Sequence, residues 1–214
     1  MLPLFPLKTV LFPDGSLDLQ IFEVRYLDMI GKCHRQGEPF GVVCLREGEE
    51  VRARSSLRAT GDAFAVEEFA DVGTLARIVE FSAPQAGLMV VRCRGGERFR
   101  ILQREQLKHG LWTARVTALP ADGDSPIPQD LQPIASTLAR LIDAQQSGDP
   151  MLGALPLHPP YRLQDCGWVA NRWSELLPLP ARLKQTLMQL DNPLLRLELV
   201  GDLMSGQRDT RPPG

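Results

Sequence analysis

The residues best suited to binding chemistry form a basic stretch near the middle of the chain. Only Glu97 and Glu105 oppose its cations, which are Arg92, Arg94, Arg98, Arg100, Arg104, Lys108 and Arg115. On a strand, side chains two residues apart share a face. Arg92 and Arg94 would therefore lie together, as would Arg98 and Arg100. Such a row could meet RNA phosphates, and these four arginines are our candidate partner-binding residues.

A solvated face of a strand pair is the alternative explanation for the same arginines. Between Arg92 and Arg104, Phe99 is the only ring that could stack on a base, and it is expected to point into the core. The whole chain carries 24 basic and 26 acidic residues, a net charge of -2. No global field therefore draws it to nucleic acid or to an anionic membrane.

Patterns typical of catalytic or metal sites do not occur. His34, His109 and His158 are far apart, and none has a His or Cys neighbour at ligand spacing. No serine stands in a G-x-S-x-G motif, and no G-x-x-x-x-G-K-[ST] motif could hold nucleotide phosphates. We expect a protein that is not an enzyme, with no catalytic residues, cofactor or metal.

Two groups of charged residues remain. Glu67, Glu68 and Asp71 could hold a cation or a basic peptide, although a solvated loop is the simpler explanation. Glu23 and Arg25 stand where a strand pattern gives way to a helix pattern. An acid in the first helical turn suits the helix dipole, and the arginine can pair with it or donate to loop carbonyls.

The N-terminal stretch should position these charges. Apolar runs at Leu7 to Phe12 and Leu17 to Phe22 flank Pro13-Asp14-Gly15, which predicts a hairpin. In the second run, Leu19 and Ile21 should be buried and Asp18 and Gln20 exposed. The period then becomes helical, so a helix is expected near 23–36.

Further strands are predicted at short intervals. Phe40 to Leu45 has apolar residues on both faces, as a central strand does. A polar loop should follow from Arg46 to Arg58. The later strands are expected to begin at Gly73, Leu88, Arg98 and Trp112, with a turn at Gly95-Gly96. Several antiparallel strands with turns between them favour a small barrel or a sandwich, and closure into a barrel would remove exposed edges.

The composition changes near Ala121, where turn residues accumulate. We place a domain boundary there, with a barrel over 1–120, a helical domain over 121–205 and a disordered tail over 206–214. Helical spacing predicts helices from about Leu131 to Ile142, Asp165 to Leu177, Leu183 to Leu190 and Leu194 to Met204. Trp168 and Trp173 should anchor the helical core.

The four cysteines and the overall hydropathy indicate the compartment. Cys33, Cys44, Cys93 and Cys166 show no C-x-x-C spacing and should be buried or half-buried free thiols. No apolar run reaches about 18 residues, and no signal-peptide pattern follows Met1. We expect a cytoplasmic protein with no membrane partner.

The chain also resembles a known family. Its opening, with a leucine-proline-rich strand, a P-D-G turn and I-F-E-V-R-Y, is similar to the start of the Lon protease N-terminal domain. The stretches GTLARIVEF and RGGERFRIL resemble that family's middle strands, and LPLPARLKQTLMQLDNPLLRLELVGDLM resembles its closing helices.

The resemblance implies an α+β fold, with a PUA-like antiparallel β-barrel followed by a helical segment. It implies a stand-alone, non-enzymatic module, without the family's ATPase and peptidase domains, that binds polypeptide substrates or protein partners. An RNA-binding PUA-like protein that uses the stretch from Arg92 to Arg115 is the alternative function. A protein partner ranks above RNA because the resemblance points there.

Overall fold

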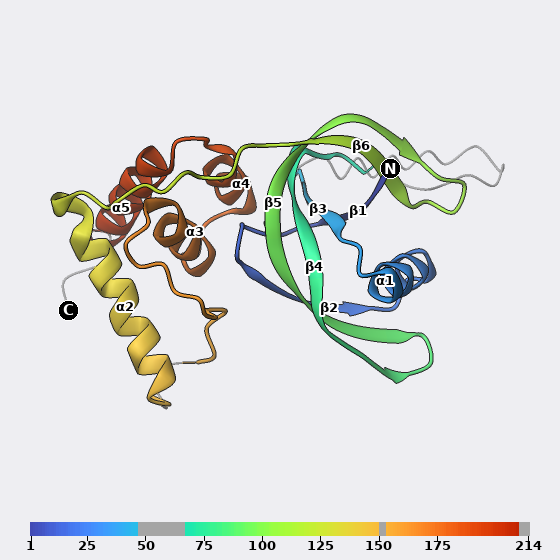
Figure 1. Ribbon diagram of the computed structural model, residues 1–214, viewed down its shortest axis with the longest axis horizontal. Coiled ribbons are helices and arrows are strands. Elements are labelled where there is room, and N and C mark those ends of the chain that lie inside the picture. The colour runs from blue at the N-terminus through green and yellow to red at the C-terminus, as the bar shows by residue number, and fades with distance from the viewer. Residues whose placement is uncertain (47–66, 150–152, 210–214) are drawn as a thin grey trace.

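Strand pairing closes the first half of the chain into a barrel, and helices form the second half (Figure 1). The computed structural model describes residues 1–46, 67–149 and 153–209. In chain order the elements are β1 (Leu2–Leu7), β2 (Ser16–Ile21), α1 (Val24–Gln36), β3 (Phe40–Leu45), β4 (Phe69–Gln85), β5 (Leu88–Gln106), β6 (Trp112–Ala118), the 3-10 turn η1 (Gln129–Leu131), α2 (Gln132–Gln146), α3 (Cys166–Leu176), α4 (Ala181–Gln189) and α5 (Pro193–Asp209).

The described strands follow the order β2-β5-β4-β3-β1-β6, and β6 pairs back onto β5. The long strand β5 makes this closure possible, because its first half pairs with β2 and its second half with β6. One pair, β1 with β3, is parallel, and the other pairs are antiparallel. The predicted α+β class, with a barrel followed by helices, is confirmed.

The predicted N-terminal hairpin is wrong. The first strand spans Leu2–Leu7, and it pairs with β3 and β6 rather than with β2. The apolar residues Val10, Leu11 and Phe12 lie between the strands and are buried. Val10 and Phe12 belong to the core cluster of the helices. That apolar run therefore packs between the two halves of the chain. Its apolar residues are needed for this packing, and they gave the sequence the appearance of a strand.

The second strand and the first helix agree with the prediction. Leu19 and Ile21 are buried, whereas Asp18 and Gln20 are exposed. Helix α1 begins at Val24 and ends at Gln36. It buries Tyr26, Met29, Ile30 and Cys33 against the barrel core.

Two of the later strands start or end differently from the prediction. Strand β3 lies between β1 and β4, as a central strand should. Strand β4 begins at Phe69, four residues before Gly73. Of the predicted loop from Arg46 to Arg58, residues 47–58 lie outside the described residues.

Strand β5 runs unbroken through Gly95 and Gly96, where the sequence predicted a turn. Gly95 serves a close approach instead: a Cβ on it would lie 2.0 Å from the carbonyl oxygen of Phe12. Its N–H donates to the Gly15 carbonyl at 2.8 Å, and its carbonyl accepts from the Asp14 N–H at 2.9 Å. A glycine here therefore lets the turn before β2 lie directly on β5.

Gly95→Ala should destabilise the protein by about 1–3 kcal/mol, because the added methyl meets backbone that must move. Gly123→Ala is the matched control, since a Cβ there would meet nothing within 4 Å. Midpoints of chemical denaturation measure both changes. Equal midpoints for the two variants would contradict the close approach at Gly95.

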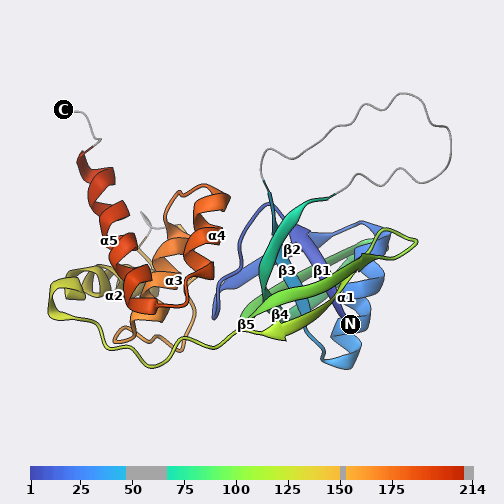
Figure 2. The same ribbon diagram turned by 90° about the horizontal axis from the view of Figure 1, so that it is seen from above.

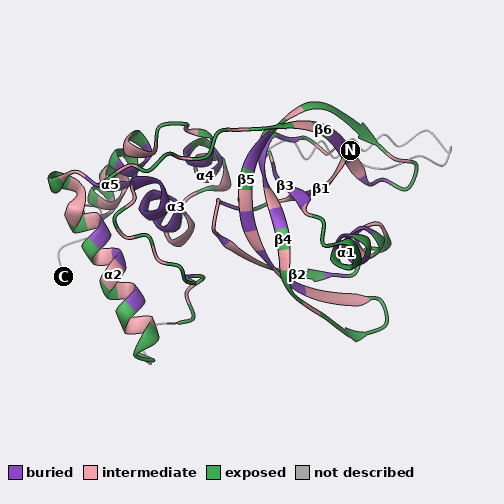
Figure 3. Ribbon diagram, in the orientation of Figure 1, coloured by how far each residue is buried: buried purple, intermediate pink, exposed green. Residues whose placement is uncertain are grey.

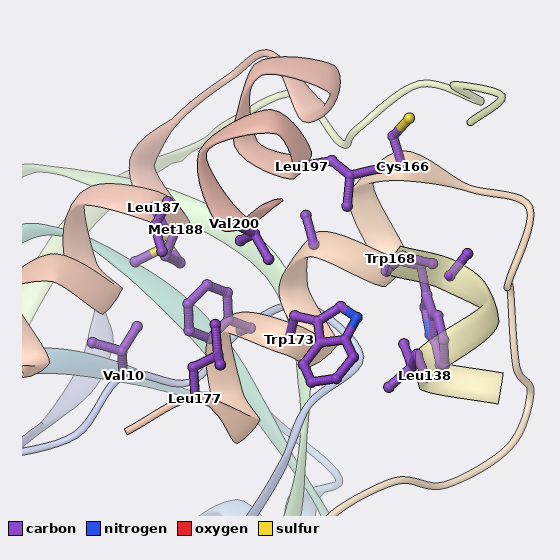
Figure 4. Close-up of a cluster of buried hydrophobic side chains, with 14 of the residues drawn as sticks. Val10, Leu138, Cys166, Trp168, Trp173, Leu177, Leu187, Met188, Leu197 and Val200 are labelled. Atoms are coloured by element: carbon purple, nitrogen blue, oxygen red, sulfur yellow. The ribbon is translucent and has the colours of Figure 1, made fainter. Parts of the chain in front are cut away.

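The helices pack around one apolar cluster that also reaches the barrel (Figure 4). Trp168 and Trp173 are 1% and 7% exposed, so their predicted role as core anchors is confirmed. Helix α3 is the most buried of the helices, as its colour in Figure 3 shows. Val10, Phe12, Cys44 and Val72 extend the cluster into the barrel half. The helices and the barrel therefore share part of one core.

The segment between β6 and η1 crosses from the barrel to the helices, which stand side by side in Figures 1 and 2. Its residues belong to no helix or strand, apart from a single bridge between Pro126 and Asp165. The domain boundary at Ala121 stays a prediction. Helix α5 continues to Asp209, so residues 206–209 are helical where we expected a disordered tail, and 210–214 lie outside the described residues.

The cysteines and the hydropathy of the helices were also subjects of prediction from the sequence. All four cysteines are buried thiols outside disulfides, which confirms the prediction for them. Burial raises the pKa of Cys93 to about 12, so this thiol stays protonated. In the part of the chain that the structure describes, no helix is long and apolar enough to cross a membrane.

Candidate functional site

A surface pocket lies where β2 ends and α1 begins. It is lined by Phe22, Glu23, Val24 and Arg25, and by His109 from the loop between β5 and β6. Four of the five lining residues are thus consecutive in the chain. The pocket is formed where one segment changes from a strand into a helix.

Two large apolar side chains stand exposed in this pocket. Phe22 is 71% exposed and Val24 is 73% exposed, and only Met1 is comparably exposed among the large apolar residues that the structure describes. Alternation along β2 explains Phe22, because Ile21 points inward and its neighbour must point outward. Val24 lies off the buried stripe of α1. Folding itself therefore leaves both side chains in water.

Arg25 fixes the position of this segment by contacts with two other parts of the chain and with Glu23 in the segment itself. Its Nε donates to Glu23 Oε2 at 3.0 Å, one terminal nitrogen donates to the Gly110 carbonyl at 2.8 Å, and the other donates to Glu67 Oε1 at 3.1 Å. The guanidinium is 16% exposed and lies 4.5 Å from the centre of the Tyr26 ring. The prediction that Arg25 pairs with Glu23 or donates to loop carbonyls is confirmed on both counts.

Glu67 in turn is held from a second side. The indole Nε1 of Trp112 donates to Glu67 Oε2 at 3.0 Å. The Trp112 ring meets Phe69 edge-on at 5.4 Å, and Arg104 lies 4.5 Å above Phe69. Glu67 therefore belongs to an ordered cluster, whereas the sequence grouped it with Glu68 and Asp71 in an expected loop; Asp71 lies in β4.

The buried phenol beneath the pocket has no role in acid–base chemistry near neutral pH. Burial raises the pKa of Tyr26 well above its ordinary value of 10. Its ring stacks on Phe5 at 4.0 Å. Among the described residues, no group of three or more His, Cys, Asp or Glu side chains could hold a metal ion. The pocket thus presents two exposed apolar side chains beside the ion pair of Glu23 and Arg25.

The structure separates the four arginines that the sequence grouped. Arg92 pairs with Asp18 at 2.9 Å and with Glu80 at 2.7 Å on the outer face of the sheet. Arg94 donates to the Pro159 carbonyl at 3.0 Å. Both are therefore already engaged within the chain.

Arg98 departs furthest from the expectation. It is 4% exposed and donates to the carbonyls of Met188, Leu190 and Pro120. Arg100 remains exposed. The expected exposed row of Arg98 beside Arg100 therefore does not form, because Arg98 is covered by the helical half. Partner binding by Arg92, Arg94 and Arg100 stays a prediction.

The pocket itself was not identified from the sequence. Phe22 could have indicated it. The alternation that buries Ile21 places the apolar Phe22 on the solvent-exposed face at the end of β2. Val24 could have been found from the helical stripe in the same way. No signal pointed to His109, because the turn between β5 and β6 reaches the pocket only in the folded chain.

Comparison with known proteins identifies what this fold resembles. Residues 1–206 match the family described as the ATP-dependent protease La (LON) substrate-binding domain. A crystal structure of a Lon N-terminal domain protein from Xanthomonas campestris is 31% identical, with a TM-score of 0.70, over 93% of this chain and 95% of that one.

A second solved structure shares the fold alone. The N-terminal domain of the Mycobacterium avium complex Lon protease has a TM-score of 0.59 at 14% identity, over 95% of this chain and 97% of that one. No curated protein matches the chain.

Proposed function

Because the chain belongs to the family of ATP-dependent protease La (LON) substrate-binding domains, we propose that it binds polypeptide at the pocket before α1. The family is the substrate-binding part of the protease, so the role of a binding module follows from membership. The proposal adds the ligand, a polypeptide, and the surface. In this proposal the chain acts in the cytoplasm by binding, without catalysis of its own.

The observation that carries the proposal is the exposure of Phe22 and Val24 on either side of Glu23. Apolar side chains left in water on an ordered framework are suited to burial against apolar side chains of a partner. Arg25 and Glu67 supply that framework, so the pair is held in place before binding. A pre-ordered site loses less conformational entropy when it binds.

Binding should fall about tenfold or more when Phe22 and Val24 are both replaced by serine. Losing the burial of two apolar side chains removes at least about 1.4 kcal/mol, which is one factor of ten in affinity. Fluorescence anisotropy with a fluorescein-labelled, unstructured peptide that has a Phe-Leu centre and glutamine flanks would measure it.

The matched control is the double variant Val79→Ser and Leu102→Ser. These two side chains are also apolar and 56% exposed, but they lie on β4 and β5 away from the pocket. The control should bind the probe like the wild type. If both double variants lose the same affinity, the contact is spread over the apolar surface and the pocket is not the site.

A further inference from the structure

The charges in the pocket distinguish between kinds of polypeptide, on the premise that the proposed function is right. Of the described residues that line it, Arg25 is the only arginine or lysine, and two carboxylates, those of Glu23 and Glu67, share its guanidinium. With His109 counted as neutral, Glu23 and Arg25 balance among the lining residues, and Glu67, which accepts from Arg25 without lining the pocket, makes this bonded group negative by one. Lys108 precedes His109 in the loop, but it does not line the pocket and is not bonded to Arg25 or to either carboxylate.

Glu23 is the carboxylate that a ligand can reach. Its side chain is 49% exposed, compared with 24% for Glu67, whose two oxygens accept from Arg25 and Trp112. Glu23 stands at the N-cap of α1, yet its side chain accepts no capping hydrogen bond. Its Oε2 accepts from the Nε of Arg25.

Glu23 also lies between the two apolar side chains in sequence. A polypeptide that lays an apolar side chain on Phe22 and Val24 must therefore place its neighbouring residues close to the Glu23 carboxylate. A lysine or arginine there gains attraction, and an aspartate or glutamate meets repulsion. Arg25 cannot offset this fully, since it is 16% exposed and bonded to Glu23, Glu67 and Gly110.

We infer that the pocket selects apolar segments flanked by basic residues, with Glu23 as the residue that determines the choice. Phe22 and Val24 supply affinity for any apolar segment, and Glu23 ranks those segments by charge. An acidic flank is the least favoured ligand. The ranking should weaken as salt screens the charges.

Three synthetic fluorescein-labelled peptides of equal length test this inference. Each carries the same Phe-Leu centre, flanked by two lysines, two glutamines or two glutamates on each side. At low salt and pH 8, the lysine peptide should bind roughly 3- to 10-fold more tightly than the glutamine peptide, and the glutamate peptide more weakly than both.

Glu23→Gln should remove most of this ranking. Glu97→Gln, which removes an exposed carboxylate that does not line the pocket, should leave the ranking as in the wild type. Equal affinity of the wild type for all three peptides would overturn the charge selection and leave the proposed function intact. If no peptide binds, or if Phe22→Ser does not weaken any of them, the proposed function fails and this inference fails with it. A ranking that survives Glu23→Gln assigns the selection to another group and also overturns it.

Discussion

Replacing Arg196 by methionine should lower the free energy of unfolding by about 3–5 kcal/mol, the usual cost of breaking a buried ion pair. The Arg196 side chain is 1% exposed. Its guanidinium donates to both oxygens of Asp122 and to the amide oxygen of Asn171. It also donates to the carbonyls of Leu187 and Leu190. Methionine can fill much of the space but donates none of these bonds.

The loss is large because Asp122 would keep its charge without its main partner. The Asp122 side chain is 10% exposed, and the nearest alternative, Arg98, lies 3.7 Å from Oδ1. Asp122 stands in the segment that crosses from the barrel to the helices, so the network ties that crossing to α3 and α5. Removing Arg196 therefore weakens the attachment of the helices as well as one ion pair.

Urea denaturation monitored by tryptophan fluorescence would measure the effect. Arg140→Met makes the same chemical change at an exposed position on α2 and should cost at most about 0.5 kcal/mol. Adding Asp122→Asn to Arg196→Met should recover part of the loss, because the unpaired charge is gone. Similar midpoints for Arg196→Met and Arg140→Met would show that the network contributes little to stability.

The buried arginines show which part of the fold the sequence could not predict. Strand and helix periods depend on near neighbours, so β2, β3, α1 and the four later helices were predictable from alternation and spacing. The exposed environment predicted for Arg98 was wrong because its partners Met188 and Leu190 lie about 90 residues further along the chain. The strand predicted around Phe12 was wrong for the same reason, because Phe12 packs in the core cluster of the helices.

The candidate site was predictable only in part. Glu23 and Arg25 are two residues apart, so their pairing follows from local spacing. Glu67, Gly110 and His109 reach the same place through strand pairing, which local patterns do not encode. Sequence reasoning therefore found the charged centre of the pocket but not the surrounding residues that order it.

The second prediction with a large expected effect concerns a buried acid between the barrel and the helices. Glu175 at the end of α3 is 11% exposed, and its Oε2 lies 2.8 Å from the Nε of Arg172. Arg172 also donates to the Pro13 carbonyl at 2.8 Å, next to the turn that precedes β2. Lys184 of α4 donates to the Glu175 carbonyl at 2.8 Å. The pair thus joins α3, α4 and the barrel.

Burial raises the pKa of Glu175 from its ordinary 4.5 to about 7, although Arg172 and Lys184 oppose the change. Asp14 adds a further increase, because a neighbouring negative charge disfavours the carboxylate. The folded protein therefore holds this proton more tightly than the unfolded chain does. The stabilising contribution is complete below pH 4.5 and is lost as the pH rises through about 7. Its full size is about 3 kcal/mol.

The stability of the wild type relative to Glu175→Gln should therefore fall by up to about 3 kcal/mol between pH 5 and pH 8. Denaturation midpoints at several pH values would give this difference directly, since glutamine at 175 cannot titrate. Glu198→Gln makes the same chemical change at an exposed position of α5 and serves as the matched control. A difference for Glu175→Gln that stays constant or rises with pH would mean that Arg172 keeps the carboxylate ionised throughout. Arg172 and Glu175 would then form a permanent ion pair within α3, and pH would not affect the junction of barrel and helices.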